Sequence, residues 1–502
     1  MIKKILILSF ILCLVSCFAK KNTTNTKGSN MLLEKIINDI KLKSTEIFYK
    51  LPDHKVITLD NKLQIIFMPD NLPYIHFKLR LNAGQRFEDL EGAAESVASL
   101  LDKGTSTLNR EEILSILDKI GASFSASAGQ EFSWIEASSL AKNETDLMNL
   151  FFKLLTEPVF LDKEWQKEKQ IILTELERLP NSPNKFLKNI FDDFIYNKTV
   201  YKGESRQSVN ALKRDNLIKF YNKHYQPESA SLLVLGQYTD KLKKDIIQKF
   251  SNWKTKDSVA STIIKSKNTF NSSITLINKT DSIQANVIIG NPVNLSSGHP
   301  DNLAVKLANF SLGGGGFNSR LMDRVRKKDG LTYAIYSGFG FLKNSGAFQI
   351  VSSTNQGSLE KLLKATFQEL TNFYNNGVSK AELDFSKLYY SNSLFRGLEK
   401  KETLMDSFLS LSGMNIDPVN YFETFSSKIK KIDLNTVNMV IKKYFNPKDM
   451  KIFVLANKDS KGGESNPKNK GSFTIIEQLN NFSKEFISHK DLDIKDYKDI
   501  NY

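Results

Sequence analysis

The chain has 502 residues, of which 40% are hydrophobic, so it is long enough for more than one globular domain with an ordinary core. It carries 70 lysines and arginines against 55 aspartates and glutamates, a net charge of +15. These basic residues are spread along the chain without forming a stripe or arm, which indicates a compositional bias and not a nucleic-acid-binding protein. Both cysteines, Cys13 and Cys17, lie near the N-terminus, so the rest of the chain can form neither a disulfide nor a cysteine-ligated metal site.

The first residues, MIKKILILSFILCLVSC, are typical of an export signal. Two lysines precede about a dozen apolar residues, a run too short to span a bilayer stably. The end of this run, Leu14 to Cys17, resembles the lipobox of bacterial lipoproteins, in which cleavage leaves the cysteine as the lipid-modified first residue. We therefore expect a signal peptide at 1–16, lipidation of Cys17 and a lipid-anchored protein of the bacterial cell envelope. Cleavage at a nearby A-x-A type site is the alternative.

Composition divides the remaining chain into segments. The polar stretch KKNTTNTKGSN is typical of a solvated tether, and the segment after it has apolar residues at helical spacing. The tail after residue 456 is polar and is expected to be disordered, except for a short helix at 475–487. The predicted segments are a tether with a short helix at 17–45, an N-terminal domain at 46–251, a linker at 252–271, a C-terminal domain at 272–456 and a polar tail at 457–502.

The two domains are predicted to be copies of each other. KHYQPESASLLVLGQ at 223–237 and KYFNPKDMKIFVLAN at 443–457 each combine a helix end, a proline and an apolar strand, at an offset of 220 residues. A repeat of this length indicates a duplicated domain and not a solenoid unit. Each half opens with alternating strand patterns that are followed by amphipathic helices, which predicts an α+β fold with a sheet covered by helices.

One helix can be predicted in detail at NREEILSILDKIG, residues 109–121. Asn109 and Glu112 can form a capping box at its start, and Gly121 can end it. The apolar residues expected on its core side are Ile113, Leu114, Ile116, Leu117 and Ile120.

Five stretches resemble, in order and spacing, the pitrilysin/insulinase peptidases, the family with the inverted zinc motif. They are LDNKLQIIFMPDNLPYIHFKLRLNAGQRFEDLEGAAESVASLLDKGT, LDKIGASFSASAGQEFSWIEASS, EPVFLDKEWQKEKQIILTELERLPNSP, LIKFYNKHYQPESASLLVLG and GGGGFNSRLMDRVRKKDGLTYAIYS. The resemblance covers about residues 50–456. It implies two homologous α+β domains, each an antiparallel sheet covered by helices, which face each other as half of a clamshell like that of the mitochondrial processing peptidase.

Active members of that family carry H-x-x-E-H on the opening helix, where two histidines on one face bind zinc and the glutamate polarises the bound water. Aligned on the K-G-T at 103–105, these positions hold Glu95, Ala98 and Ser99, so both histidine ligands and the general base are missing. Glu175 falls where the family has its remote zinc-binding glutamate, and a surface or structural role explains Glu175 equally well.

No other metal site is predicted. The five histidines lie at least 22 residues apart, so none forms a helical pair. Glu95 with Glu175 could hold a hard cation weakly, but catalytic zinc needs three protein ligands with nitrogen among them. The remaining carboxylates cannot replace a zinc-activated water in amide hydrolysis. We therefore expect no metal and no cofactor in this chain.

The other half of the family's active site is present in VRKKDGLTY. By resemblance, Arg326 and Tyr333 bind the substrate backbone and steady the tetrahedral oxyanion, since both can donate to developing negative charge. Without the family context, they would be interpreted as a solvated helix residue and a core strand residue. The glycines at 313–316 resemble a phosphate loop only superficially, because no G-K-[ST] follows them. The resemblance places a turn beside the substrate cleft there.

These features predict a zinc-less, non-catalytic subunit of a two-chain metallopeptidase. It would bind peptide or unfolded protein and lend Arg326 and Tyr333 to the zinc site of a homologous partner chain, without cleaving peptides alone. A purely structural or peptide-binding envelope lipoprotein is the second hypothesis. An active peptidase with an unusual metal site is the third.

The lipid anchor can be tested by cell fractionation. Stable anchoring takes more than one acyl chain, and Cys17 is the predicted attachment point. We expect Cys17→Ser to release the mature chain from the membrane fraction, whereas Cys13→Ser leaves it membrane-bound. A Cys17→Ser chain that stays with membranes after salt washing would contradict the anchor.

Overall fold

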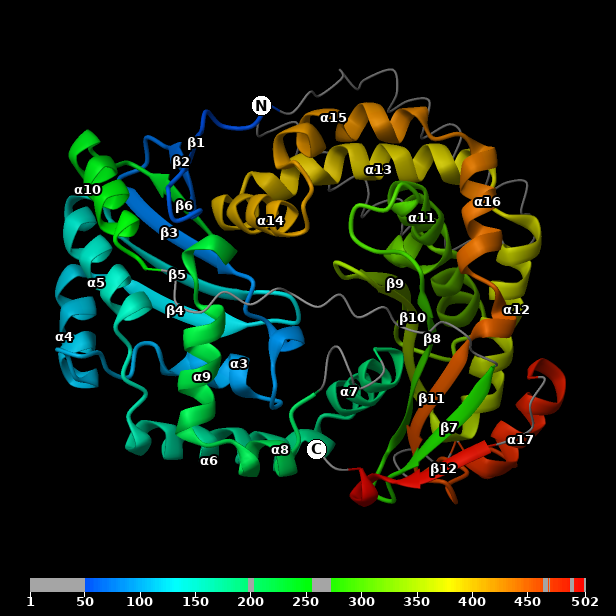
Figure 1. The fold of residues 1–502 in the computed structure, drawn as a ribbon. Coiled ribbons are helices and arrows are strands. Elements are labelled where there is room, and N and C mark those ends of the chain that lie inside the picture. The colour runs from blue at the N-terminus through cyan, green and yellow to red at the C-terminus, as the bar shows by residue number, and fades with distance from the viewer. Residues whose placement is uncertain are drawn as a thin grey trace.

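The computed structural model describes residues 50–196, 203–254, 272–463, 468, 470–487 and 492–500. Within them the chain forms two α+β halves that face each other (Figure 1). The predicted signal peptide, Cys17 and the tether at 17–45 lie outside the described residues, as does most of the predicted linker at 252–271. No helix in the described part of the chain is long and apolar enough to cross a membrane.

The first half is built on a six-stranded sheet with the strand order β1-β2-β6-β3-β5-β4. Its neighbouring strands are antiparallel except β2 and β6, which are parallel. The strands are β1 (Lys55–Thr58), β2 (Gln64–Pro69), β3 (Tyr74–Leu81), β4 (Ser123–Ala128), β5 (Ser133–Leu140) and β6 (Ala230–Gly236). The helices are α3 (Ala93–Leu100), α4 (Arg110–Ile120), α5 (Glu144–Thr156), α6 (Asp162–Arg178), α7 (Pro183–Ile195), α8 (Arg206–Ala211), α9 (Arg214–His224) and α10 (Asp240–Ser251).

The second half has a six-stranded sheet with the strand order β12-β7-β11-β8-β10-β9. Here β7 is parallel to both β12 and β11, and the other neighbours are antiparallel. The strands are β7 (Ser273–Asn278), β8 (Gln284–Val293), β9 (Ile335–Phe341), β10 (Gly346–Asn355), β11 (Lys451–Ala456) and β12 (Leu492–Asp496). The helices are α11 (Asn302–Asn309), α12 (Leu359–Asn376), α13 (Lys380–Leu398), α14 (Lys401–Gly413), α15 (Pro418–Lys431), α16 (Leu434–Tyr444) and α17 (Ile475–Phe486).

Five strands of each sheet repeat the same order, β2-β6-β3-β5-β4 and β7-β11-β8-β10-β9, which confirms the predicted α+β fold and its duplication. The sixth strands differ, because β1 precedes β2 and is antiparallel to it, whereas β12 is the last strand of the chain and is parallel to β7. Strands β6 and β11, which carry the sequence repeat, each follow a helix and a short turn that begins with a proline. Each lies between the first two strands of the shared pattern, β2 and β3 in the first half and β7 and β8 in the second. Because those two strands run in opposite directions, the inserted strand must be parallel to one of them. The sheets are therefore mixed and not wholly antiparallel.

Helix α4 confirms the predicted helix at 109–121 with its capping box. The Asn109 side chain accepts a hydrogen bond from the Glu112 backbone at 2.9 Å, and Glu112 accepts one from the Asn109 backbone at 2.8 Å. Gly121 ends the helix in the left-handed region, with φ of 57°. One expectation was wrong, because Leu114 is 44% exposed. The buried stripe follows the spacing i, i+4, i+7 and consists of Ile113, Leu117 and Ile120.

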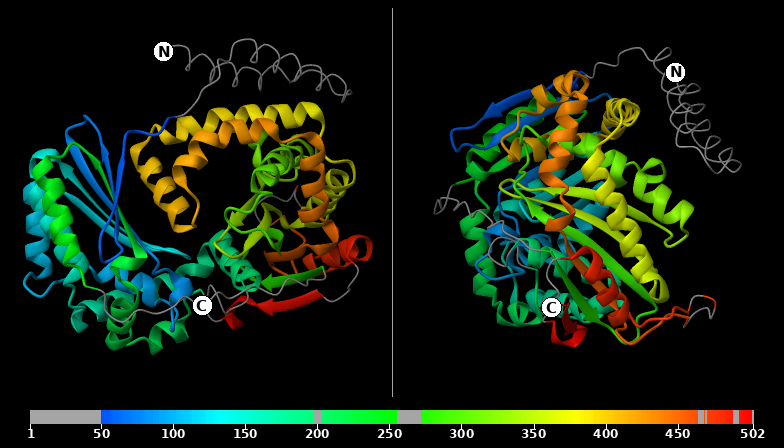
Figure 2. Two further views of the ribbon diagram at one scale, coloured as in Figure 1. Left: turned by 45° about the horizontal axis from the view of Figure 1, so that its top comes forward. Right: turned by 90° about the vertical axis from the view of Figure 1, so that its right-hand side faces the viewer.

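Each sheet buries its outer face under helices of its own half and its inner face under a helix of the other half. Helix α14 lies on the inner face of the first sheet (Figure 1). There Met405 and Phe408 pack against Ile66 and Leu233. Helix α7 lies on the inner face of the second sheet (Figure 2). Its residues Phe186, Leu187, Phe191 and Ile195 pack against Ile277, Ile288, Phe453 and Leu455.

A hydrogen bond from the second half to a buried ion pair of the first half also joins the two halves. Glu131 accepts hydrogen bonds from Arg86 at 2.7 Å and from the Lys343 backbone, in the turn between β9 and β10, at 2.8 Å. The Arg86 and Glu131 side chains are only 6% and 4% exposed. The Lys343 ammonium donates to the Gly413 carbonyl at the end of α14, at 3.3 Å. Lys343 therefore links the end of α14 to the turn between β9 and β10, and links that turn to Glu131 of the first half.

The residues after 456 do not form a disordered tail throughout. The predicted short helix at 475–487 is confirmed as α17, and Ile475, Leu479 and Phe482 in it are fully buried. Strand β12 joins the second sheet as its edge strand. The second half therefore extends to these residues, because α17 covers apolar side chains of α12 that would otherwise face water.

We predict that helix α7, which packs on the sheet of the other half, is needed for stability. Phe191 is fully buried against Phe453, with their ring centroids 5.8 Å apart. Phe191→Ala leaves a cavity and is expected to lower the free energy of unfolding by about 3–5 kcal/mol. The exposed Leu114→Ala is the control, with an expected change of about 0.5 kcal/mol or less. Urea unfolding monitored by circular dichroism measures both free energies of unfolding. Equal losses for the two substitutions would contradict the stabilising role of α7.

Candidate functional site

Helix α3 is the opening helix that carries Glu95, Ala98 and Ser99. Gly92 precedes it with φ of 90°, and the Glu88 carboxylate accepts hydrogen bonds from the backbone nitrogens of Gly92 at 3.1 Å and Ala94 at 2.7 Å. This carboxylate caps the helix start, where free N–H groups and the helix dipole favour an acceptor. The small residues of α3 let it pack closely against α9 and β4.

The three positions that the resemblance aligns with the zinc motif have hydrogen-bonding or packing roles in this structure. The Glu95 carboxylate accepts a hydrogen bond from the backbone nitrogen of Ala128, the last residue of β4, at 2.6 Å. Ala98 is 1% exposed and has no donor atom to offer a metal. The Ser99 hydroxyl donates to the Ser96 carbonyl at 3.1 Å. Side chains with this chemistry do not fit a catalytic zinc ion.

Glu175 lies on α6 and is exposed. Burial raises the pKa of Glu95, and the negative charges of Glu168 and Glu175 add to this rise, so Glu95 and Glu175 are near enough to repel each other. Throughout the described ranges, no group of three or more His, Cys, Asp or Glu side chains is arranged to hold a metal ion. Glu95 and Glu175 thus lie in one neighbourhood, as a carboxylate pair, and whether they hold a cation stays a prediction.

The structure adds two carboxylates that the sequence did not single out. Burial raises the pKa of Glu88 to about 8 and that of Glu204 to about 7. Glu204 also feels the negative charges of Glu95, Glu175 and Glu168 and the opposing positive charge of Lys185. Its side chain lies against Gly92, 3.3 Å from where a Cβ would be. Glu204 could not be predicted as a site residue, because it meets α3 only through packing between segments far apart in the sequence.

Arg326 and Tyr333, predicted as substrate-binding residues, lie side by side. The guanidinium carbon of Arg326 lies 4.7 Å from the centroid of the Tyr333 ring and 4.6 Å from that of Phe317. Tyr333 is 83% exposed, and Phe317 is 57% exposed. Arg326 belongs to a π-helical segment, Met322–Lys328, a conformation frequent at functional sites. Phe317 was not predicted as a site residue. The sequence feature that could have indicated it is an aromatic residue directly after four glycines.

The glycine run has a packing role. A Cβ on Gly313 would lie 2.4 Å from the Ser337 hydroxyl oxygen and 2.6 Å from its backbone nitrogen, so only glycine fits against β9. Gly316 adopts φ of 57°, in the left-handed region. The chain can therefore turn tightly on β9 and deliver Phe317 to one face of Arg326.

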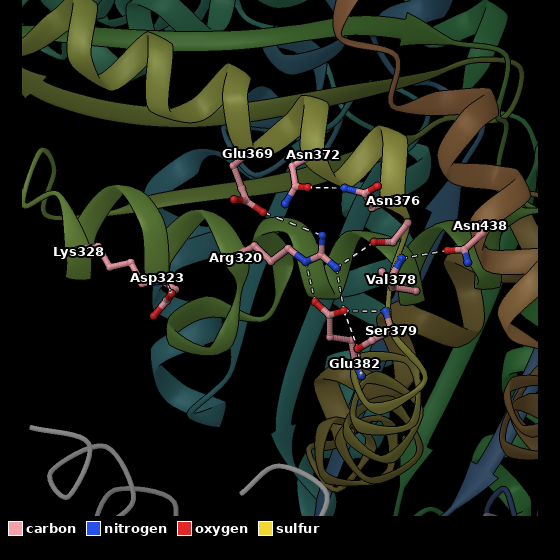
Figure 3. A network of polar contacts seen from close by, with 11 residues as sticks. Arg320, Asp323, Lys328, Glu369, Asn372, Asn376, Val378, Ser379, Glu382 and Asn438 are labelled. Carbon is pink, nitrogen blue, oxygen red and sulfur yellow. Dashed lines mark hydrogen bonds and ion pairs between the residues drawn. The ribbon is translucent and has the colours of Figure 1, made fainter. Parts of the chain in front are cut away.

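Arg320 anchors the start of the segment that carries Arg326 (Figure 3). Its guanidinium donates two hydrogen bonds to the Glu382 carboxylate, at 2.6 and 2.8 Å, and one to the Gly377 carbonyl at 2.9 Å. A bidentate pair of this kind has a defined geometry. It fixes the segment relative to α12 and α13.

Sequence comparisons find matches over most of the chain. Residues 75–207 match the model of the insulinase family, peptidase family M16, and residues 211–388 match the model of the M16 peptidase inactive domain. An uncharacterized zinc protease of Rickettsia felis is 28% identical over 395 residues, which cover 74% of this chain and 91% of the relative. The uncharacterized zinc protease YmxG of Bacillus subtilis is 24% identical over 369 residues, covering 72% and 86%.

Solved structures share the fold. The M16 peptidase inactive domain from Pseudomonas fluorescens superimposes with a TM-score of 0.74 at 23% identity, over 80% of this chain and 98% of the other. A protease from Helicobacter pylori superimposes with a TM-score of 0.73 at 21% identity, over 81% and 100%. Both cover the two halves, which supports the clamshell arrangement.

We predict a pH-dependent effect of Glu204 on stability. Its pKa of about 7 in the folded chain exceeds the value of about 4.3 for an unfolded chain, so its stabilising contribution is present at low pH and is lost as the pH rises through 7. Glu204→Gln should therefore gain about 2 kcal/mol relative to the native chain between pH 5 and pH 8. Urea unfolding at both pH values measures the gain. Glu177→Gln, at an exposed site on α6, should show no such pH dependence; an equal response of both variants would refute the assignment.

Proposed function

We propose a function from the premise that the chain carries two domains of the M16 (insulinase) peptidase family, in tandem on one polypeptide. The proposed function is that of a zinc-less, non-catalytic subunit of a two-chain peptidase. The chain binds peptide or unfolded protein and contributes oxyanion stabilisation to the zinc site of a homologous partner. The lipobox at Leu14 to Cys17 supports a place in the bacterial cell envelope, anchored by lipid.

The chemistry of α3 supports a role without zinc. The relatives in Rickettsia felis and Bacillus subtilis are named zinc proteases. In this chain Ala98 has no ligand atom, the Ser99 hydroxyl is bonded to a carbonyl, and Glu95 is bonded to the end of β4. Zinc would need three protein ligands in this place. We therefore assign the metal to the partner chain alone.

The observation that carries the proposal is the arrangement of Arg326 and Tyr333. The two rings hold the guanidinium in place, and the Tyr333 side chain is exposed to a partner or a substrate. Donors held in advance at the position of a developing oxyanion stabilise a transition state without reorganisation. Such donors contribute to hydrolysis only when a nucleophile attacks the same carbonyl. In the assembled complex, the zinc site of the partner would supply that nucleophile.

Strand β4 supports the proposed binding of peptides. It ends the first sheet and pairs only with β5 among the described residues, so its outer edge is free for another strand. Extended peptides bind such edges through main-chain hydrogen bonds. Because Glu95 on α3 holds the last residue of β4, the former metal helix now fixes the end of this edge.

We expect the chain to create peptidase activity when it is mixed with a zinc-bearing relative from the same cell. Tyr333→Phe should leave the complex intact and lower its turnover about 10²-fold to 10³-fold, the usual cost of losing one oxyanion donor. Tyr336→Phe, which changes another exposed tyrosine at 53% exposure, is the matched control and should retain activity. Peptide cleavage and size-exclusion chromatography measure activity and assembly.

Two outcomes would contradict the proposal. Stoichiometric zinc in the purified chain, lost on Glu175→Gln, would indicate an active peptidase with an unusual metal site. A complex that cleaves peptides equally well with Arg326→Ala and Tyr333→Phe combined would remove the shared site. A purely structural or peptide-binding envelope protein would then be the better account.

A further inference from the structure

A groove lies in the second half where four helices meet. Figure 1 shows α13 and α15 side by side, with α14 at the end of α13 that is nearer the first half. The groove has a volume of about 270 Å³ and is lined by residues of these three helices and by Lys306 of α11. We call it the α13 groove. Its apolar and aromatic lining residues are Tyr390, Leu394, Leu398, Tyr421 and Phe425, and the others are Ser393, Gly397, Thr403 and Ser407.

The helices around the α13 groove leave part of its apolar lining open. Tyr390, Leu394 and Tyr421 are only half-buried. A Cβ added to Gly397 would meet no atom within 4 Å, so the wall is not filled at this point either. Covering apolar surface of this kind is favourable in water, so the groove has the chemistry of a docking site for another apolar element.

The described part of the chain begins beside the α13 groove. Leu51 is only 4% exposed and packs in one cluster with Leu398 and Leu404. Leu398 also lines the groove, and Leu394 and Tyr421 pack against the same cluster. The residues directly before Leu51 are therefore held near the groove by the chain itself. Such a covalent link gives them a high effective concentration at this surface.

The segment LEKIINDIKLKSTEIF, residues 33–48, lies outside the described residues, and its sequence predicts an amphipathic helix. At about 100° per residue, one face holds six apolar residues with Ser44 in its centre. The six are Leu33, Ile36, Ile37, Ile40, Ile47 and Phe48. A helix of this length would span about 24 Å, which is comparable with about 28 Å for the 19 residues of α13.

We infer that residues 33–48 form a helix that docks its apolar face in the α13 groove. An amphipathic helix laid in an apolar groove is a recurrent mode of recognition. A separate partner would lose translational and rotational freedom on docking, whereas this segment is already tethered at Leu51. The inference goes beyond the proposed function, because it concerns no substrate and no peptidase partner.

The docked helix would determine how the body is held at its N-terminal end. Only the polar stretch at 20–30 would remain as a free tether, with a reach of at most about 40 Å. The α13 groove would then face the attachment point of the chain. Because α14 continues from the groove onto the first sheet, both halves would be held in a fixed orientation.

Disulfide cross-linking in the full chain tests the docking. With Cys13→Ser and Cys17→Ser the chain has no thiol, so two cysteines can be added without competition. Ser44→Cys places one in the centre of the apolar face, and Ser393→Cys places the other in the groove. We expect an intramolecular disulfide after mild oxidation in intact cells, identified by mass spectrometry of the linked tryptic peptides. Ser407→Cys, also in the groove but on α14, provides a second position.

Matched controls separate a docked helix from a loose tether. Thr45→Cys lies next to Ser44 but points about 100° away around the helix, so its disulfide with Ser393→Cys should form about tenfold more slowly. Ser251→Cys, exposed on α10 of the first half, should not link to Ser44→Cys. Ile40→Asp should slow the groove disulfide about tenfold, because it places a charge in the apolar face. Lys35→Asn, on the opposite face, should not slow it.

Three outcomes would overturn the inference. Equal rates for Ser44→Cys and Thr45→Cys would indicate a tether without a docked face. Disulfide-linked dimers in place of the intramolecular product would show that the groove receives the segment of a second copy. No disulfide at either groove position, in chains whose circular dichroism matches the native chain, would show that the segment lies elsewhere. Each of these results would leave the proposed function untouched, since none depends on peptide binding or cleavage.

Discussion

Neither sheet can bury its inner face without a helix from the other half, and this exchange determines how the two halves lie. Helix α14 covers the first sheet and α7 covers the second. The alternation along β3 shows why cover is needed on both sides, since Phe77 and Leu79 face the helices of their own half while Lys78 and Arg80 face α14. Burying such polar groups is tolerable only where partners meet them, and Asp406 on α14 supplies one.

Helix α3 and the segment around Arg326 lie in very different surroundings in the two halves. In the first half, α3 packs in the core, where Ala98 is buried and Glu95 and Ser99 make hydrogen bonds to backbone groups. In the second half, the segment from Gly313 to Tyr333 carries an arginine close to two exposed aromatic rings. Stability alone would not favour an exposed tyrosine beside an unpaired cation. The contrast is the physical basis for assigning a binding role to the second half and a supporting role to the first.

Much of the fold could be predicted because it is encoded in local patterns. The strand alternation and the capping box at Asn109 reflect interactions between residues close in sequence, and the 220-residue repeat shows directly in the letters of two short segments. Leu114 was wrongly placed because an apolar residue next to a buried stripe does not show its direction from the pattern alone. The packing of α7 on the sheet of the other half could not be predicted, because its amphipathic pattern shows an apolar face but not which sheet that face contacts. Phe317 was missed for a similar reason, because its contact with Arg326 depends on a tight turn of glycines.

The position of α7 in the chain sets the order in which the molecule can be completed. Its apolar face is synthesised with the first half, but the strands that cover it, β8 and β11, come much later. A newly made first half therefore exposes both the face of α7 and the inner face of its own sheet until α14 arrives. Surfaces of this kind attract chaperones and other unfinished chains. Long-range closure of this kind is intrinsically slow, so a chain truncated between the halves would remain a substrate for quality-control proteases and would not yield an independent half.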